Sequence, residues 1–180
     1  MKQAVVVTGL PASGKTTVAR HLAQLLNVPL LDKDDFLEEL YEEQFPQTQA
    51  KRRELSKISD TLFQQSAMAL DAVVLVSHWR PTCGPQNTGT PTDWLPQTFA
   101  QIVEVQCECS PDMATTRFLK RIRHPGHRDR DRDPADLAAG MMLLAKGYPL
   151  GLGTLMTVDT EGQPDLLSLA AEIKRFGRRP

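Results

Sequence analysis

The sequence lacks the features that mark membrane, secreted or disulfide-linked proteins. No apolar stretch approaches the ~18 residues of a membrane span, and the chain reaches Gly9 and Pro11 too early for a signal peptide. The three cysteines, Cys83, Cys107 and Cys109, are odd in number and lack zinc-binding spacing, so we interpret them as reduced thiols. We therefore expect a cytoplasmic protein, without membrane association, that is a monomer or a weak dimer.

The chain also has almost no net charge. The 180 residues include 21 Lys and Arg against 22 Asp and Glu, a formal net charge of −1. This balance argues against a broadly basic nucleic-acid-binding protein and against an acidic tail. Domains commonly have about 100–200 residues, so we interpret residues 1–180 as one domain.

Short apolar runs alternate with segments of helical spacing along the chain. The expected strands are 3–8, 30–32, 72–77, 100–109 and 155–158, and the expected helices are 15–26, 35–44, 48–70, 111–122, a helix from 134, and 164–176. This alternation predicts an α/β protein with three layers, in which helices cover both faces of a five-stranded parallel sheet. Residues 78–98 have neither period and are rich in Pro and Gly, which indicates an irregular loop.

A phosphate-binding loop follows the first expected strand. Residues 9–16 read Gly-Leu-Pro-Ala-Ser-Gly-Lys-Thr and match GxxxxGK[ST] at each fixed position. The glycines allow a tight turn whose N–H groups point at phosphate oxygens, and the helix that follows aims its positive end at the same place. Lys15 would reach the β- and γ-phosphates, and the Thr16 hydroxyl would coordinate Mg²⁺. The residues predicted to bind ATP here are Gly9, Leu10, Pro11, Ala12, Ser13, Gly14, Lys15, Thr16 and Thr17.

Missing motifs narrow the kind of P-loop protein. There is no NKxD sequence for guanine recognition, and the third expected strand ends at Ser77 without the acid that motor ATPases place there. Two carboxylates, Asp32 and Asp34, instead follow the second strand. In a parallel sheet this strand end faces the ligand crevice. One carboxylate there can orient an acceptor hydroxyl and take its proton, while the other holds Mg²⁺ through water.

With these motifs the chain resembles the small P-loop kinases, among them shikimate kinase, chloramphenicol phosphotransferase, the zeta toxins and polynucleotide 5'-kinase, and is most similar to bacterial members of their AAA domain group. The resemblance implies a P-loop kinase fold with a short helical lid. It also implies that Asp34 is the base or acceptor-orienting carboxylate and that Asp32 serves Mg²⁺ together with Thr16. Polynucleotide kinases have an arginine where this chain has Leu37, so a nucleic-acid acceptor is not expected.

Two oppositely charged segments make up the near-zero net charge. Residues 117–133 contain seven basic and three acidic residues, a net charge of +4, whereas residues 32–43 contain seven acids and one lysine, a net charge of −6. Guanidinium groups stabilise the charge of a transferred phosphoryl group, so we interpret 117–134 as a lid. Arg117 and Arg121, four residues apart on one predicted helical face, are its candidate catalytic arginines, and Arg128 is a candidate ATP ligand. A self-paired, solvated surface is the alternative for residues 128–132.

The irregular loop 78–98 belongs on the acceptor side, because it leaves the carboxyl end of the third strand. Trp79 could stack on the acceptor and Arg80 could steer an anionic group, unless the tryptophans only hold the loop against the body of the protein. Asp34 and Asp35 are further candidate acceptor-binding residues.

The sequence thus predicts an ATP-dependent kinase that transfers the γ-phosphoryl group to a hydroxyl of a small-molecule acceptor, with Mg²⁺. Two alternatives remain open: a nucleotide-binding regulatory module that phosphorylates no metabolite, and a polynucleotide 5'-kinase. The acceptor, the essential lid arginine and a second carboxylate for Mg²⁺ in place of Ser77 are not determined by the sequence.

Overall fold

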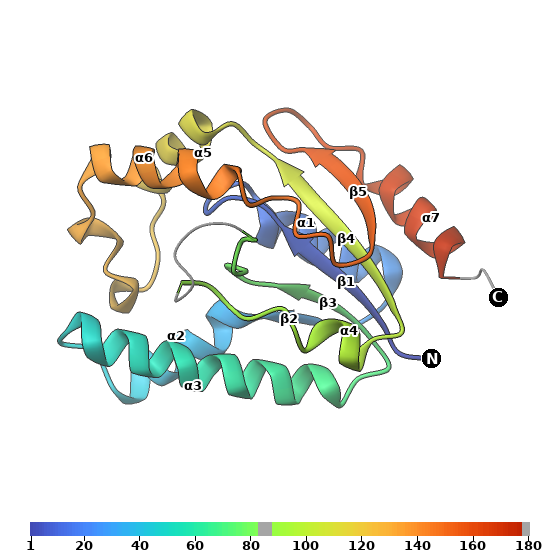
Figure 1. Ribbon diagram of the computed structural model, residues 1–180, viewed down its shortest axis with the longest axis horizontal. Helices are drawn as coiled ribbons and strands as arrows, with labels where there is room; N and C mark the ends of the chain where they lie inside the picture. Colours follow the sequence, from blue (N-terminus) through green and yellow to red (C-terminus); the bar gives the residue numbers. More distant parts are fainter. Residues whose placement is uncertain (83–87, 178–180) are drawn as a thin grey trace.

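The five predicted strands form one parallel sheet in the order β2-β3-β1-β4-β5 (Figure 1). The computed structural model describes residues 1–82 and 88–177, so Cys83 lies outside the described residues. In the register of the sheet Val5 pairs with Val74 on one side and with Val103 on the other, which places β1 at the centre. The strands are β1 (Gln3–Thr8), β2 (Leu30–Asp32), β3 (Ala72–Val76), β4 (Gln101–Glu108) and β5 (Thr154–Asp159). The predicted α/β class and the five-stranded parallel sheet are confirmed.

Helices begin where the sequence supplies capping side chains. The Thr48, Ser110 and Asp133 side chains each accept a backbone N–H from the first turn of the helix that follows them. The helices are α1 (Lys15–Leu26), α2 (Lys33–Glu43), α3 (Gln49–Met68), α4 (Leu95–Thr98), α5 (Pro111–Lys120), α6 (Pro134–Ala145) and α7 (Leu166–Phe176). The described helices do not include one with the length and apolar character that a membrane crossing requires.

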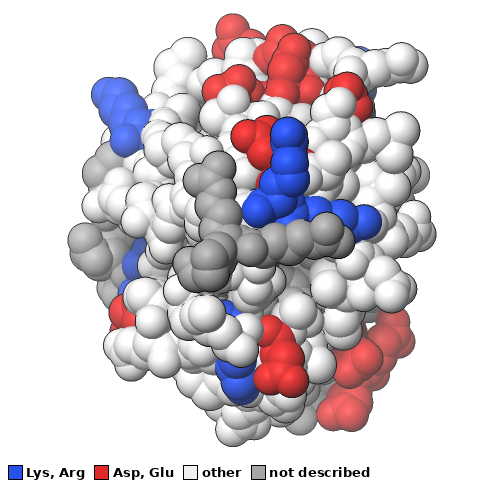
Figure 2. Space-filling model, turned by 90° about the vertical axis from the view of Figure 1, so that its right-hand side faces the viewer, with Lys and Arg blue, Asp and Glu red and all other residues white. Residues whose placement is uncertain are grey.

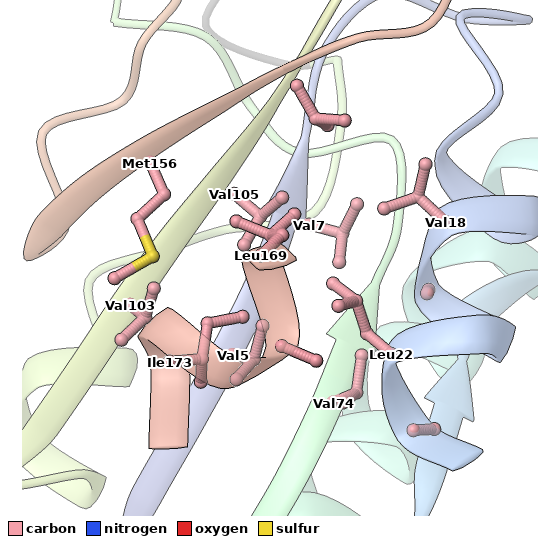
Figure 3. Close-up of a cluster of buried hydrophobic side chains, with 14 of the residues drawn as sticks. Val5, Val7, Val18, Leu22, Val74, Val103, Val105, Met156, Leu169 and Ile173 are labelled. Atoms are coloured by element: carbon pink, nitrogen blue, oxygen red, sulfur yellow. The ribbon is translucent and has the colours of Figure 1, made fainter. Parts of the chain in front are cut away.

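Alternate residues of the strands pack on opposite faces of the sheet. Val5 and Val7 of β1 point toward α1 and α7, where Leu22 and Leu169 complete a buried cluster (Figure 3). On the opposite face, β1 packs against a cluster that includes Phe63 of α3 and residues of the segment after β3. Each face of the sheet is therefore covered, and the edge formed by the carboxyl ends of the strands is left for a site.

The segment after β3 is anchored to the body by its tryptophans. Trp79 is fully buried, and its Nε1 donates to the Val7 carbonyl at 2.9 Å. Trp94 is buried in the same cluster, and its Nε1 donates to the Pro91 carbonyl at 2.9 Å. The helix α4 also interrupts this segment, which the sequence analysis treated as irregular throughout. The packing agrees with the alternative in which the tryptophans hold the loop in place.

The two ends of the sheet differ in charge. The end that carries the termini, formed by the amino ends of the strands, has a mixture of acidic and basic side chains among uncharged ones (Figure 2). The segments of strongly unlike charge, α2 and the 121–133 region, lie together at the other end, as the ribbon shows (Figure 1). The charge asymmetry predicted from the sequence is therefore concentrated at the carboxyl edge of the sheet.

A buried carboxylate connects β4 to the chain that leads into β5. Glu104 is 0% exposed, and its Oε1 accepts the Leu150 N–H at 2.6 Å while its Oε2 accepts the Leu152 N–H at 3.0 Å. The Thr8 hydroxyl donates to the same carboxylate at 3.2 Å. Each oxygen of the Glu104 carboxylate accepts one backbone N–H, so both oxygens are needed to satisfy the buried donors.

We expect Glu104→Gln to lower the free energy of unfolding by about 1–3 kcal/mol, since either orientation of the amide leaves one buried N–H facing an NH₂ group. Urea denaturation followed by circular dichroism measures this change. Glu108→Gln, at the exposed end of the same strand, is the matched control and should change stability little. Equal stability of the two variants would contradict a structural role for Glu104.

Candidate active site

The phosphate-binding loop has the backbone conformation that its glycines allow. Gly9 has φ +130° and Gly14 has φ +91°, both in a region that side chains disfavour. A Cβ atom on Gly9 would lie 2.7 Å from the Cys107 carbonyl oxygen, so β4 leaves no room for one. Leu10 is buried between α5 and α6, whereas Thr17, the last predicted ATP ligand, is exposed. The turn between β1 and α1 is thus built as the motif predicts.

Lys15 is folded back onto the loop from which it projects. Its Nζ donates to the carbonyl oxygens of Gly9 at 3.0 Å and Leu10 at 2.6 Å. The side chain is buried, and this burial lowers the pKa of Lys15 to about 8 even though Cys107 and Asp34 act in the opposite direction. A buried ammonium with only carbonyl partners is prepared to exchange them for phosphate oxygens, which would stabilise its charge.

Thr16 and Asp32 form the pair expected to serve a metal ion. The Thr16 hydroxyl donates to Asp32 Oδ2 at 3.0 Å, while Asp32 Oδ1 accepts the Asp34 N–H and caps α2. Burial and the neighbouring Asp34 raise the pKa of the Asp32 carboxyl to about 6. The described residues contain no group of three metal-ligating side chains. A hydroxyl and one carboxylate fit Mg²⁺, which is normally held by few protein oxygens together with water and substrate phosphates.

Asp34 lies in the first turn of α2 and is paired with the lid. Its carboxylate forms an ion pair with the Arg123 guanidinium. Burial raises the pKa of Asp34, but the positive charges of Arg123, His127 and Lys33 outweigh burial and bring the pKa below its usual value. Lys15 is close enough to act in the same direction. Asp34 is therefore an ionised carboxylate that faces the phosphate-binding lysine.

Residues 117–120 of the predicted lid belong to α5, and residues 121–133, called the lid from here on, rest on α2 through polar and aromatic side chains. His127 Nε2 contacts Glu38 Oε1 at 2.8 Å, and His124 Nε2 contacts Glu42 Oε1 at 3.0 Å. The Tyr41 ring stacks on His124 at a centroid distance of 5.5 Å. The basic lid and the acidic helix recognised in the sequence thus meet directly in the folded chain.

Gly126 lets the lid approach this closely, which predicts the effect of a single methyl group. A Cβ at Gly126 would lie 2.6 Å from Tyr41 Cγ, so Gly126→Ala should move the lid off α2. We expect faster tryptic cleavage within 121–133, and turnover lowered by about 10-fold or more because lid groups would be misplaced. Gly140→Ala, on α6 with no neighbour within 4 Å of the new Cβ, is the control. Cleavage of the Gly126 variant at the wild-type rate would contradict this packing.

The three arginines predicted to act in the lid, Arg117, Arg121 and Arg128, contact different parts of the chain. The expectation that Arg117 and Arg121 share a helical face is wrong, because α5 ends at Lys120 and Arg121 has extended backbone. Arg121 lies near Lys15 and pairs with Asp129 at 2.8 Å.

Arg117 and Arg128 are bound to other parts of the chain. Arg117 Nη2 donates to the Thr160 carbonyl at 2.8 Å, in the loop after β5. Arg128 pairs with Asp131 at 2.6 Å and donates to the Gln47 carbonyl at 3.0 Å. Their predicted roles toward ATP therefore remain predictions.

A cavity lies on the β4 and β5 side of the phosphate-binding loop. Its volume is about 480 Å³, and its lining includes Leu10, Cys109, Tyr148 and Glu161. Arg117 borders the same region, because its Nη1 contacts Cys109 Sγ at 3.8 Å. The cavity is adjacent to the loop that would hold the phosphates and is on the side away from α2 and α3.

On the side of α2 and α3, a buried polar network replaces the missing acid at Ser77. The Ser77 and Thr90 hydroxyls are 2.7 Å apart, and Thr90 Oγ1 donates to Asp60 Oδ1 at 2.7 Å. Asp60 is 3.3 Å from the buried Lys33 Nζ, which also donates to Ser56 Oγ at 2.8 Å. Ser77 is thus committed to fixing the segment after β3, and it offers Mg²⁺ no carboxylate.

Some residues that the sequence analysis did not assign to the site are found beside its expected centre. Burial and the nearby positive charges of Lys15 and Lys33 lower the pKa of His78 to about 3, although Asp34 acts in the opposite direction. Arg52 of α3 lies next to Lys33. The only sequence signal for His78 is its place after β3, and Arg52 has no motif at all.

The predicted acceptor-side residues are not equivalent. Trp79 is fully buried and has no exposed ring face on which an acceptor could stack. Arg80 is half-buried, and Asp35 is exposed on α2 beside the half-buried Asp34. The acceptor-binding roles of Arg80, Asp34 and Asp35 therefore remain predictions.

Residues 5–138 match the family model of the AAA domain, which covers most of the chain. The chain belongs to the AAA domain family. A protein classed as a kinase from Chloroflexus aurantiacus, known from its crystal structure, is 29% identical with a TM-score of 0.78 over 97% of both chains. Shikimate kinase from Bacteroides thetaiotaomicron has the same fold, with a TM-score of 0.61 at 19% identity over 98% of both chains. The predicted P-loop kinase fold of this AAA domain is confirmed.

A cytidylate kinase from Pyrobaculum neutrophilum is 37% identical to this AAA domain over 76 residues. The match covers 39% of this chain and 41% of that enzyme, so the chain spans less than half the length of this curated relative.

Proposed function

We propose that this AAA domain protein is an ATP-dependent phosphotransferase that moves the γ-phosphoryl group to a hydroxyl of a small-molecule acceptor, with Mg²⁺. The observation that carries the proposal is the convergence of three groups at one edge of the sheet. Asp34 of α2 pairs with Arg123, which together with Arg121 contacts the lid carboxylate Asp129. On the other side, the hydroxyl of Thr16, the residue after Lys15, donates to Asp32, whose carboxylate also accepts the Asp34 N–H. Phosphoryl transfer needs little covalent help and depends on positioning and on charge stabilisation.

Each group has a role in this arrangement. Lys15 and the loop amides would hold the phosphates, and the Thr16 hydroxyl with Asp32 would hold Mg²⁺. The metal ion would supply positive charge at the phosphates. Asp34 would accept a hydrogen bond from the acceptor hydroxyl and take its proton. Arg121 would stabilise the charge that spreads over the transferred group.

Arg123 suggests how the site passes from its resting arrangement to its working one. It pairs with Asp34 and also lies 3.6 Å from Asp129, a second carboxylate within the lid. An acceptor hydroxyl that binds Asp34 would displace Arg123, which can stay paired with Asp129. The released guanidinium would then be available to the phosphoryl group, so acceptor binding and completion of the arginine set would occur together.

A screen for ADP release tests the proposal. Purified protein with ATP and MgCl₂ is assayed alone and with single compounds from sugars, sugar acids, nucleosides, nucleotides, antibiotics and vitamins. We expect ADP production that depends on one class of acceptor, with mass spectrometry showing an acceptor heavier by one phosphoryl group. Tight ATP binding without turnover for any acceptor would favour the regulatory module.

A phosphate acceptor is the second candidate, and the similarity to cytidylate kinase favours it. In that case the acceptor oxygen belongs to a nucleoside monophosphate and arrives ionised, so Asp34 would not be needed as a base. Including CMP in the screen separates the two functions, because the product would then be a nucleoside diphosphate.

A further inference from the structure

Lys33, the first residue of α2, is buried against α3, which lies beside α2 (Figure 1). Its side chain is 8% exposed. The Nζ atom donates to Ser56 Oγ at 2.8 Å and lies 3.3 Å from Asp60 Oδ1, and both partners belong to α3. Taking an ammonium out of water is unfavourable unless the group is paired and hydrogen-bonded. These two partners therefore hold the Lys33 side chain in one direction, toward α3.

Asp60 extends this contact to the segment after β3. The Thr90 hydroxyl donates to Asp60 Oδ1 at 2.7 Å, and Ser77 Oγ lies 2.7 Å from Thr90 Oγ1. A hydroxyl has one proton to donate. Because Thr90 uses its proton toward the carboxylate, Ser77 is the donor of the second bond. One polar chain that begins at Lys33 thus joins α2, α3 and the end of β3, which are far apart in the sequence.

The direction of Lys33 fixes the orientation of its neighbours on α2. Successive side chains of a helix point about 100° apart, so rotation of α2 about its axis decides where each side chain of the first turn lies. Asp32 caps this turn and accepts the Thr16 hydroxyl. Asp34, two positions further on, is paired with Arg123 of the lid. Lys33 lies between these carboxylates in the sequence, so its anchorage to α3 restrains the turn that carries both.

The described bonds of the two carboxylates are ones that the proposed mechanism exchanges. Asp32 would turn to Mg²⁺, and Asp34 would turn to the acceptor hydroxyl. The apolar contacts of α2 with α3 include Leu37 and Tyr41, which lie further along the helix, and apolar contacts are not directional. Both partners of Lys33 lie outside the proposed mechanism, so its contacts can persist while the other bonds of the turn are exchanged.

We propose that Lys33, through Ser56 and Asp60, is the positioning residue for the carboxylates of Asp32 and Asp34. The inference rests on the proposed function, because it gives Lys33 a role in phosphoryl transfer without contact to either substrate. A misplacement of about 1 Å in a catalytic group can lower the rate about 10²-fold. A polar anchor beside the two carboxylates would prevent such a displacement.

Lys33→Met tests this role, with kcat and the ATP KM measured separately in the ADP-release assay. Methionine retains the apolar part of the side chain but makes neither polar contact. We expect kcat to fall by about 10- to 100-fold because the carboxylates are misplaced, with the ATP KM nearly unchanged because the phosphate-binding loop is intact. Lys57→Met, at an exposed lysine of α3, is the charge-matched control and should leave both constants at wild-type values. A wild-type kcat in Lys33→Met would overturn the positioning role.

Two further variants separate loss of position from loss of stability. Lys33→Met/Asp60→Leu removes the buried pair as a whole, which often costs little stability because no buried charge is left unpaired. Its kcat should still be low. Glu104→Gln is expected to lose stability in β4, which β1 and β3 separate from β2, and it should keep the wild-type kcat below its melting temperature. Recovery of kcat in the double variant, or an equal loss of kcat in Glu104→Gln, would contradict positioning.

Hydrogen exchange followed by mass spectrometry reports on the turn without turnover. The Asp34 N–H is bonded to Asp32 Oδ1 at 3.0 Å, so its exchange rate reports how well the first turn of α2 is held. We expect faster exchange in peptides covering residues 32–40 of the Lys33→Met/Asp60→Leu protein, with peptides of α7 exchanging as in wild type. That result without turnover in the acceptor screen would keep Lys33 as the anchor of this turn and reject the kinase. Exchange of residues 32–40 at the wild-type rate would overturn the inference.

Discussion

Replacing Lys15 with alanine is expected to lower turnover by about 10³-fold or more, because one preorganised charge directed at the phosphates disappears. Lys15 projects from the phosphate-binding loop. Its Nζ lies 3.0 Å from the Gly9 carbonyl oxygen and 2.6 Å from the Leu10 carbonyl oxygen. Steady-state ADP release with the identified acceptor measures the loss. Nucleotide binding, followed by the rise in melting temperature with MgADP, should weaken in parallel.

A suitable control for this variant is Lys57→Ala, an exposed lysine of α3. The structure of Lys15→Ala must also be checked, since the loop loses two hydrogen bonds from Nζ. Circular dichroism and urea denaturation show whether the fold is retained. Turnover of a folded Lys15→Ala protein within a few-fold of wild type would end the assignment of this loop to the γ-phosphoryl donor.

Asp34→Asn is expected to lower kcat by about 10²-fold or more while ATP still binds, which is the usual size of an effect on general-base catalysis. Asparagine has nearly the same shape, but it cannot take a proton and carries no charge for Arg123. The measurement is kcat and KM for both substrates. For a group that acts on the acceptor hydroxyl, kcat should fall and the ATP KM should not.

Glu39→Gln provides the control, because Glu39 is an exposed carboxylate of the same helix. It should retain wild-type kcat. If the acceptor oxygen is a phosphate, Asp34→Asn should reduce kcat far less, so the same variant distinguishes the two candidate functions. A wild-type rate with a hydroxyl acceptor would remove Asp34 from the mechanism.

The charge pattern explains why the lid rests on α2. Acidic side chains of α2 contact lid residues, as in the ion pair of Asp34 with Arg123 and the hydrogen bond between Glu38 and His127. The pair of Asp34 with Arg123 is partly exposed, and such pairs contribute little free energy, so it can be exchanged for contacts with phosphate groups. In the proposed mechanism, Arg123 of the lid would have to leave Asp34 before Asp34 could bind an acceptor hydroxyl.

Local patterns were sufficient for the parts of this protein that depend on neighbours in sequence. Residues 9–16 fold as predicted, because a strand, a glycine-rich turn and a helix need only adjacent residues. The parallel sheet followed from alternating strands and helices, because crossover connections leave few other topologies. The helices predicted from 111 and from 134 begin where expected, because the Ser110 and Asp133 caps act over only three residues.

Contacts between distant segments decided what the local pattern left open. A spacing of four residues predicted that Arg117 and Arg121 share one helical face, but α5 ends at Lys120. Arg117, still in the helix, bonds to the loop after β5, whereas Arg121, beyond the helix, lies near Lys15. The sequence left open whether Trp79 stacks on an acceptor or holds the loop in place. Its contact with the Phe63 ring and its hydrogen bond to the Val7 carbonyl place it in the core.

Arg52 is the clearest case of a residue that only the tertiary structure reveals. In the sequence it is one basic residue of three in a helix, next to Lys51 and Arg53. In the fold Lys51 pairs with Glu54 and Arg53 is exposed, while Arg52 is half-buried near Lys33. The sequence by itself determined the phosphate-binding loop and the order of the layers. Packing decided which charged side chains gather beside this loop, because burial and the pairing of charges depend on segments that are far apart in the chain.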